Sequence, residues 1–72
     1  MIIVGSALKQ ARESAGITAS ELAKEANVSR PTLVGAEKGT PIRYPYASRI
    51  VNALNRLAGT DYTVEELEIA TV

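Results

Sequence analysis

The fold is indicated most clearly by residues 17–39, ITASELAKEANVSRPTLVGAEKG. Thr18 and Glu21 have the spacing of a capping box, in which the threonine hydroxyl accepts from the backbone N–H of the glutamate and the glutamate accepts from that of the threonine. Asn27 then tolerates the left-handed backbone of a tight turn, and Ser29 can cap a second helix. The stretch therefore predicts two short helices joined by a turn of about three residues.

Two helices joined by so short a turn need a small residue where their backbones meet, and Ala23 supplies it. Val28 and Leu33 are apolar residues that can lock the two helices together. These are the mechanical requirements of a helix-turn-helix, which we predict from about Thr18 to Lys38. The alternative on spacing alone is a plain hairpin of two helices within a small bundle.

Three more helices are expected outside this motif. The first covers about residues 7–15, and the fourth begins at Pro45 and is closed by Gly59. A second capping box, Thr63–Glu66, opens a short fifth helix that includes Leu67. The sequence thus predicts one compact all-α domain of five helices that takes up all 72 residues.

The second helix of the motif presents an outer face that suits double-stranded DNA. Arg30, near its N-terminus, is placed to read guanine in the major groove or to clamp a phosphate. Val34 and the bare backbone of Gly35 suit close contact with thymine methyls and sugars, whereas Lys38 and Arg43 are placed as phosphate contacts. The candidate DNA-binding residues are Thr18, Ser29, Arg30, Pro31, Thr32, Val34, Gly35, Lys38 and Arg43.

Charge is distributed unevenly, although the chain has no net charge. Residues 29–58 carry a net charge of +4, and residues 59–72 carry −4. A polyanion would be attracted to the middle of the chain and repelled by its tail, although these charges could equally do no more than solvate helix faces. Near the start of the fourth helix, Arg49 is a further candidate phosphate contact, and Tyr44 and Tyr46 could bind phosphate or cap the core.

The composition argues against several classes of protein. The chain has no cysteine and no histidine, so it lacks disulfides, thiolate metal ligands and the commonest general base. Its acidic residues near the C-terminus lack the ligand spacing of a calcium loop. No apolar run is long enough to span a bilayer, and no secretion signal is present. We therefore expect a cytoplasmic protein that is not an enzyme and uses no metal or cofactor.

Residues 8–67 resemble the lambda-repressor/Cro (XRE) type of helix-turn-helix domain. LKQARESAG, residues 8–16, stands as the first helix, and YASRIVNALN, residues 46–55, looks like the fourth. Within the motif, the Leu-Ala pair, the Val-Ser pair and the final Glu-x-Gly stand where the family has them. The resemblance implies five helices, binding to operator DNA, commonly as a dimer on a palindromic site, and an ion pair between Arg12 and Glu37 that ties the first helix to the third.

One departure from the family pattern lies at Ala19, where the family usually has a glutamine that contacts a backbone phosphate. The expected function is still that of a sequence-specific transcriptional regulator, and in particular a repressor. Two alternatives stay open, namely the antitoxin of a toxin–antitoxin pair and a protein-interaction module that keeps the fold without binding DNA. Ala19 and the zero net charge favour the second of these.

Two surfaces for protein partners are also predicted. Met1–Val4 and Ile69–Val72 are short, apolar and β-prone, so they could pair within one chain or form the seam of a homodimer. The acidic C-terminal face is the candidate surface for a different protein.

Overall fold

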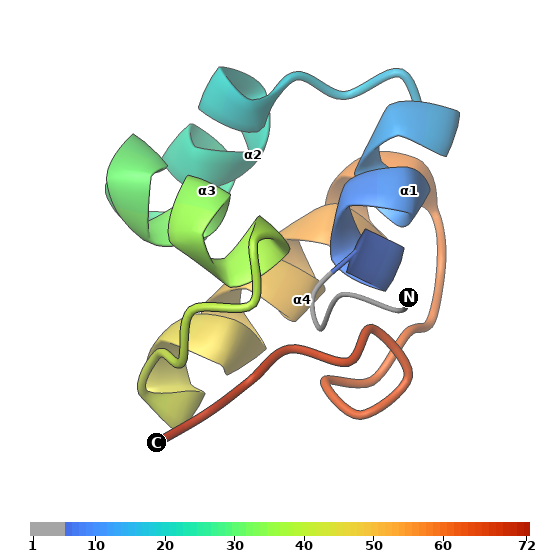
Figure 1. Cartoon of the computed structure of the whole chain (residues 1–72). Helices are drawn as coiled ribbons and strands as arrows, with labels where there is room; N and C mark the ends of the chain where they lie inside the picture. Colours follow the sequence, from blue (N-terminus) through green and yellow to red (C-terminus); the bar gives the residue numbers. More distant parts are fainter. Residues whose placement is uncertain (1–5) are drawn as a thin grey trace.

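The computed structural model describes residues 6–72, and this part of the chain contains four helices. They are α1 (Ser6–Ser14), α2 (Ala19–Ala26), α3 (Arg30–Glu37) and α4 (Tyr44–Ala58). Helix α4 is the longest, and in Figure 1 it runs from the lower left to behind α1. Helix α2 packs against both α3 and α4, and α1 packs against α3. None of the helices among the described residues is long and apolar enough to cross a membrane.

A single apolar core lies between these helices. Small residues line much of it, and they let the short helices approach closely. Burying one large aliphatic side chain in such a core contributes about 2 kcal/mol. The largest fully buried side chains are Leu8, Leu22, Leu33, Ile50, Leu54 and Leu67. Every one of the four helices therefore contributes to the core, and so does the chain that follows α4.

Local capping sets both ends of α2 and the C-terminal end of α4. The backbone N–H of Glu21 donates to the Thr18 hydroxyl over 3.1 Å, and the Thr18 N–H donates to the Glu21 carboxylate over 3.0 Å. Helix α4 ends at Gly59, whose φ of +68° lies in the left-handed region that glycine adopts without strain. The predicted capping box at the start of α2 is confirmed, and the predicted range of α1 differs by one residue at each end.

The predicted fifth helix does not form within the described residues. The Thr63–Glu66 capping box is complete, with N···O distances of 3.0 and 3.1 Å, but only one turn follows it. A longer helix would place Glu68 on the same face as the buried Val64, and would turn Ile69 away from the core. Instead, Glu68 adopts a left-handed φ of +55°, which ends the turn and lets Ile69 become buried.

The C-terminal segment pairs within its own chain. The N–H of Ile42 donates to the carbonyl of Ala70, and the N–H of Val72 donates to the carbonyl of Ile42, both over 3.0 Å. These bonds form an isolated parallel bridge between Ile42 and Thr71, which closes the loop between α3 and α4 against the end of the chain. The other predicted pairing segment, Met1–Val4, lies outside the described residues.

Candidate nucleic-acid interface

The turn between α2 and α3 is held by backbone hydrogen bonds. Asn27 has φ +57° and ψ +45°, the left-handed conformation predicted for it. Its N–H donates to the carbonyl of Lys24 over 3.2 Å, and the Val28 N–H donates to the carbonyl of Ala23 over 3.1 Å. Val28 itself packs against the core. These contacts end α2 and fix the angle at which α3 leaves it.

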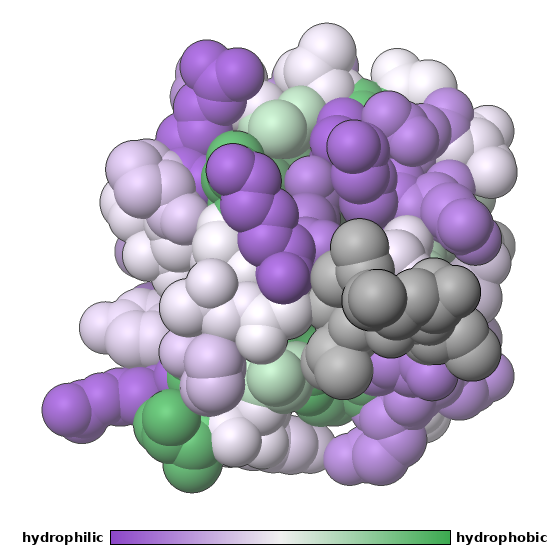
Figure 2. Space-filling view, viewed as in Figure 1, coloured by the Kyte–Doolittle hydropathy of each residue, from purple (hydrophilic) through white to green (hydrophobic). Residues whose placement is uncertain are grey.

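Helix α3 separates an inner face from an outer one. Leu33, Ala36 and Glu37 are buried on the inner face. The residues at helical spacing on the opposite side are Pro31, Val34, Gly35 and Lys38. Figure 2, in the orientation of Figure 1, shows side chains of intermediate hydropathy over α3, with strongly hydrophilic ones beside them. Of the predicted contact residues of this helix, Arg30, Pro31 and Lys38 are exposed, and Thr32, Val34 and Gly35 are half-buried.

The predicted hydroxyl contacts also cap helices. The Ser29 hydroxyl accepts from the backbone N–H of Thr32 over 3.2 Å and lies 2.7 Å from the Thr32 hydroxyl. The Thr18 hydroxyl accepts from Glu21. In each case the structural bond occupies an acceptor site on the oxygen, and Thr18 keeps its hydroxyl hydrogen for a donor role. Capping and phosphate binding are therefore compatible at the start of both helices.

Gly35 lies beside the loop that follows α3. Its carbonyl accepts from the N–H of Thr40 over 2.9 Å and from that of Lys38 over 3.0 Å. A Cβ added at Gly35 would lie 3.5 Å from the Cβ of Thr40, which is an ordinary van der Waals contact. Thr40 thus covers part of the glycine, and the backbone predicted to be bare is only half exposed.

A buried ion pair joins α1 to α3. The Nε of Arg12 donates to one carboxylate oxygen of Glu37 over 2.6 Å, and a terminal nitrogen of Arg12 donates to the other oxygen over 3.2 Å. The contact is therefore bidentate. The other terminal nitrogen donates to the carbonyl of Ile17 over 2.9 Å. The hydrogen bond with Glu37 raises the pKa of Arg12 above its ordinary value. The pair implied by the family resemblance is confirmed, and it compensates the only carboxylate on α3.

A second group of exposed side chains lies at the start of α4. Arg43, a predicted phosphate contact, occupies the residue before the helix and is exposed. The guanidinium of Arg49 lies 5.6 Å from the centre of the Tyr46 ring, a cation–π contact. Tyr44 and Tyr46 are 52% and 40% exposed, so they lie largely on the surface instead of covering the core.

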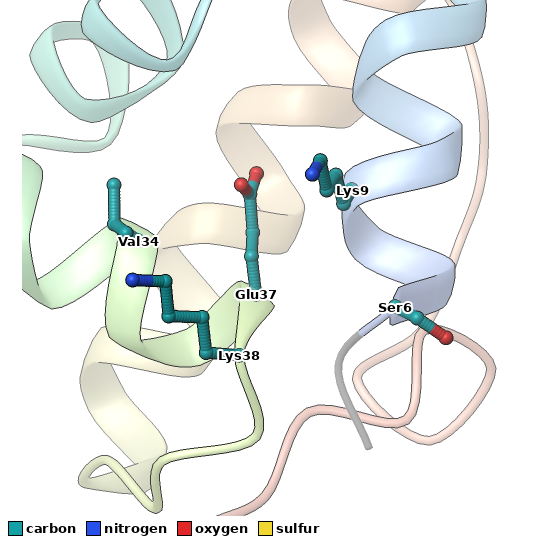
Figure 3. A pocket seen from close by; sticks show the side chains of 5 residues that line it. All are labelled: Ser6, Lys9, Val34, Glu37 and Lys38. Atoms are coloured by element: carbon teal, nitrogen blue, oxygen red, sulfur yellow. The ribbon is translucent and has the colours of Figure 1, made fainter. Parts of the chain in front are cut away.

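A groove of about 340 Å³ separates α1 from α3. It is lined by Ser6, Lys9, Val34, Glu37 and Lys38. Figure 3 shows Lys9 reaching from α1 toward α3, while the last three side chains come from α3 or its end. Sequence reasoning did not single out Lys9, because its place beside α3 depends on how the two helices pack and no local pattern carries that information.

Comparison with known proteins assigns this arrangement to a family. A family model described as Helix-turn-helix matches residues 8–58, which is more than two thirds of the chain. The matched segment contains both motif helices, the Arg12–Glu37 pair, most of α1 and all of α4. No curated protein and no solved structure matches the chain.

Proposed function

Because the chain belongs to the XRE-type helix-turn-helix family of lambda repressor and Cro, we propose that it binds a specific double-stranded DNA sequence and represses transcription. The observation that carries the proposal is the outer face of α3. This face is flanked by a cation at each end of the helix, Arg30 and Lys38, and the only carboxylate of α3 is turned inward onto Arg12. An acidic group facing DNA would repel it, so this arrangement favours a polyanion.

In this proposal α3 lies in the major groove. Arg30, which is exposed at the first position of the helix, reads a base edge or holds a phosphate, and Val34 contacts apolar groups of the groove. Lys38 and Arg43 neutralise phosphates beyond the end of α3, and Arg49 adds a further positive charge on α4. The hydroxyl of Thr18 donates to a phosphate at the start of α2, where Ala19 offers no polar side chain.

Selection of bound sites from a random pool of duplex DNA tests the proposal directly. A recovered motif, measured against mixed-sequence DNA, would establish binding and specificity together. Arg30→Ala should then weaken binding to the selected site by about 1–3 kcal/mol and relax the preference at one base pair. Equal losses on both DNAs would make Arg30 a phosphate contact. A folded wild-type protein that does not bind any duplex at low salt would contradict the proposal.

We also propose that the protein acts as a homodimer, since the family commonly uses a palindromic site. Of the predicted C-terminal seam, Ile69 is buried within its own chain, and Thr71 and Val72 remain exposed. A seam at these residues would bring a second copy against Val72, which is 83% exposed. Sedimentation at rising concentration should show dimers, and Val72→Lys should weaken them. A monomer at all concentrations, with and without the selected site, would contradict this part.

A further inference from the structure

The groove between α1 and α3 is positively charged, and part of this charge comes from α1, which lies outside the helix-turn-helix motif. Lys9 and Lys38 both line it, and no carboxylate among residues 6–72 lies within salt-bridge distance of either one. Glu37 also lines the groove, but its charge is balanced by the bidentate contact with Arg12. The groove therefore keeps two positive charges that have no partner within the described chain.

The wall of the groove suits the backbone of a nucleic acid. Its lining is mainly apolar, with Val34 and the aliphatic stems of the lysines below the two ammonium groups. Deoxyribose is the less polar part of a DNA strand and phosphate is its charged part. A sugar would contact the apolar wall while the flanking phosphate meets an ammonium group. The alternation of less polar and charged groups along the strand therefore matches the lining of the groove.

We propose that this groove seats the sugar–phosphate backbone of one DNA strand and that Lys9 is a phosphate contact. This inference rests on the proposed function and adds α1 to the elements that touch DNA. Val34 and Lys38 belong both to the outer face of α3 and to the groove, so a strand that leaves α3 passes directly along the groove. Lys9, which reaches across from α1, then holds that strand from the other side (Figure 3).

The first test compares Lys9→Gln with the wild type on mixed-sequence duplex DNA over a range of salt concentrations. For each bound protomer, loss of one phosphate contact should make the slope of log K against log salt shallower by about 1 and weaken binding roughly five- to tenfold near 0.1 M salt. Lys9→Arg should restore both. Arg56→Gln is the matched control for loss of charge, because Arg56 lies at the far end of α4 and contacts Glu25. It should leave the slope unchanged.

A second test locates the DNA strand. The chain has no cysteine, so a Lys9→Cys variant accepts a single tethered iron–EDTA group that cleaves nearby backbone. Cleavage should fall on one strand at the edge of each half-site to which a protomer binds, and the same group at an Arg56→Cys variant should give none there.

Three outcomes would overturn the inference, and they differ in whether the proposed function is contradicted as well. If the wild type binds DNA and Lys9→Gln binds equally well with an unchanged slope, only the role of the groove is wrong. If octanoate, a small amphipathic anion, binds at Lys9 and the salt slope does not depend on that residue, the groove is a small-molecule site. If the folded wild type does not bind DNA at all, the proposed function is wrong as well.

Discussion

Glu37 lies on the helix proposed to meet DNA, yet its side chain faces the opposite way. Its carboxylate is almost entirely shielded from solvent and is held by two nitrogens of Arg12. A buried charge is tolerated only when it is paired and its hydrogen bonds are satisfied. No buried side-chain polar atom lacks a partner among residues 6–72. At the scale of a residue, this pair fixes α3 against α1 and removes a negative charge from the outer face.

Removing one member of this pair should destabilise the fold strongly. Glu37→Leu leaves the Arg12 charge buried without its partner, which costs about 3–5 kcal/mol. That is a large part of the roughly 4–11 kcal/mol available to a domain of this size. The double variant Arg12→Met/Glu37→Leu should recover most of the loss, since no charge is then buried. Urea unfolding followed by circular dichroism measures the free energy of unfolding of each.

The exposed pair between Arg56 and Glu25 is the control for that experiment. Its Nε–Oε2 distance is 3.1 Å, but its side chains are 58% and 40% exposed. Glu25→Leu should therefore cost less than about 1 kcal/mol. If Glu37→Leu costs no more than Glu25→Leu, burial does not set the strength of the Arg12–Glu37 contact.

At the scale of elements, the sequence predicts helix caps, which depend on neighbouring residues, but it does not predict how distant segments pack. The ends of α2 follow from Thr18, Glu21 and Asn27, which act within a few residues, so the motif was predicted correctly. Thr63 and Glu66 made an equally good capping box, but the burial of Ile69 stopped the helix after one turn. A cap starts a helix, and its length is decided by tertiary contacts.

The same limit applies to the site. Arg12 and Glu37 are 25 residues apart, and their pairing was expected only from the family resemblance. The groove beside Lys9 joins two helices that are not neighbours in sequence, and nothing in the local pattern indicates it. Contacts within a helix or turn were therefore predictable, whereas those between α1 and α3 needed the fold.

The capping box of α2 should make stability depend on acidity. The hydrogen bond from the backbone N–H of Thr18 lowers the pKa of Glu21 below its ordinary value of 4.5. Because the pKa of Glu21 is lower in the folded protein than in the unfolded chain, its ionised form stabilises the fold at pH values above the unfolded-state pKa. This stabilisation is lost as the pH falls through the folded-state pKa. Glu21→Gln keeps an oxygen that can accept from Thr18 but does not titrate.

Thermal unfolding of both proteins between about pH 6 and pH 2 measures the effect. The Tm of the wild type minus that of Glu21→Gln should be largest near neutral pH and should fall as the solution becomes more acidic than about pH 4.5. All other titrating groups are shared, so the subtraction isolates Glu21. A difference that stays constant over the whole range would show that the carboxylate contributes nothing as an anion.

At the scale of the whole molecule, zero net charge and attraction to DNA are compatible because the charges are segregated. The cations proposed to contact DNA lie on α1, on α3 and around the start of α4. The acidic residues after Gly59 are exposed and follow the last helix. The relevant quantity for DNA binding is the number of phosphates that the cationic residues neutralise, since each contact releases counterions.

The salt dependence of binding should report that number. At most five phosphate contacts are offered by Lys9, Arg30, Lys38, Arg43 and Arg49, and four if Arg30 contacts a base instead. The slope of log K against log salt should therefore be about −4 per bound protomer. Anisotropy of a labelled mixed-sequence duplex over a range of sodium chloride concentrations measures it. The variant Asp61→Gln removes one negative charge from the acidic residues after Gly59. It should leave the slope unchanged, because the slope counts phosphate contacts and not total charge. A slope near zero would mean that these cations do not neutralise phosphates, and a slope near −8 per bound protomer would require cations outside this set.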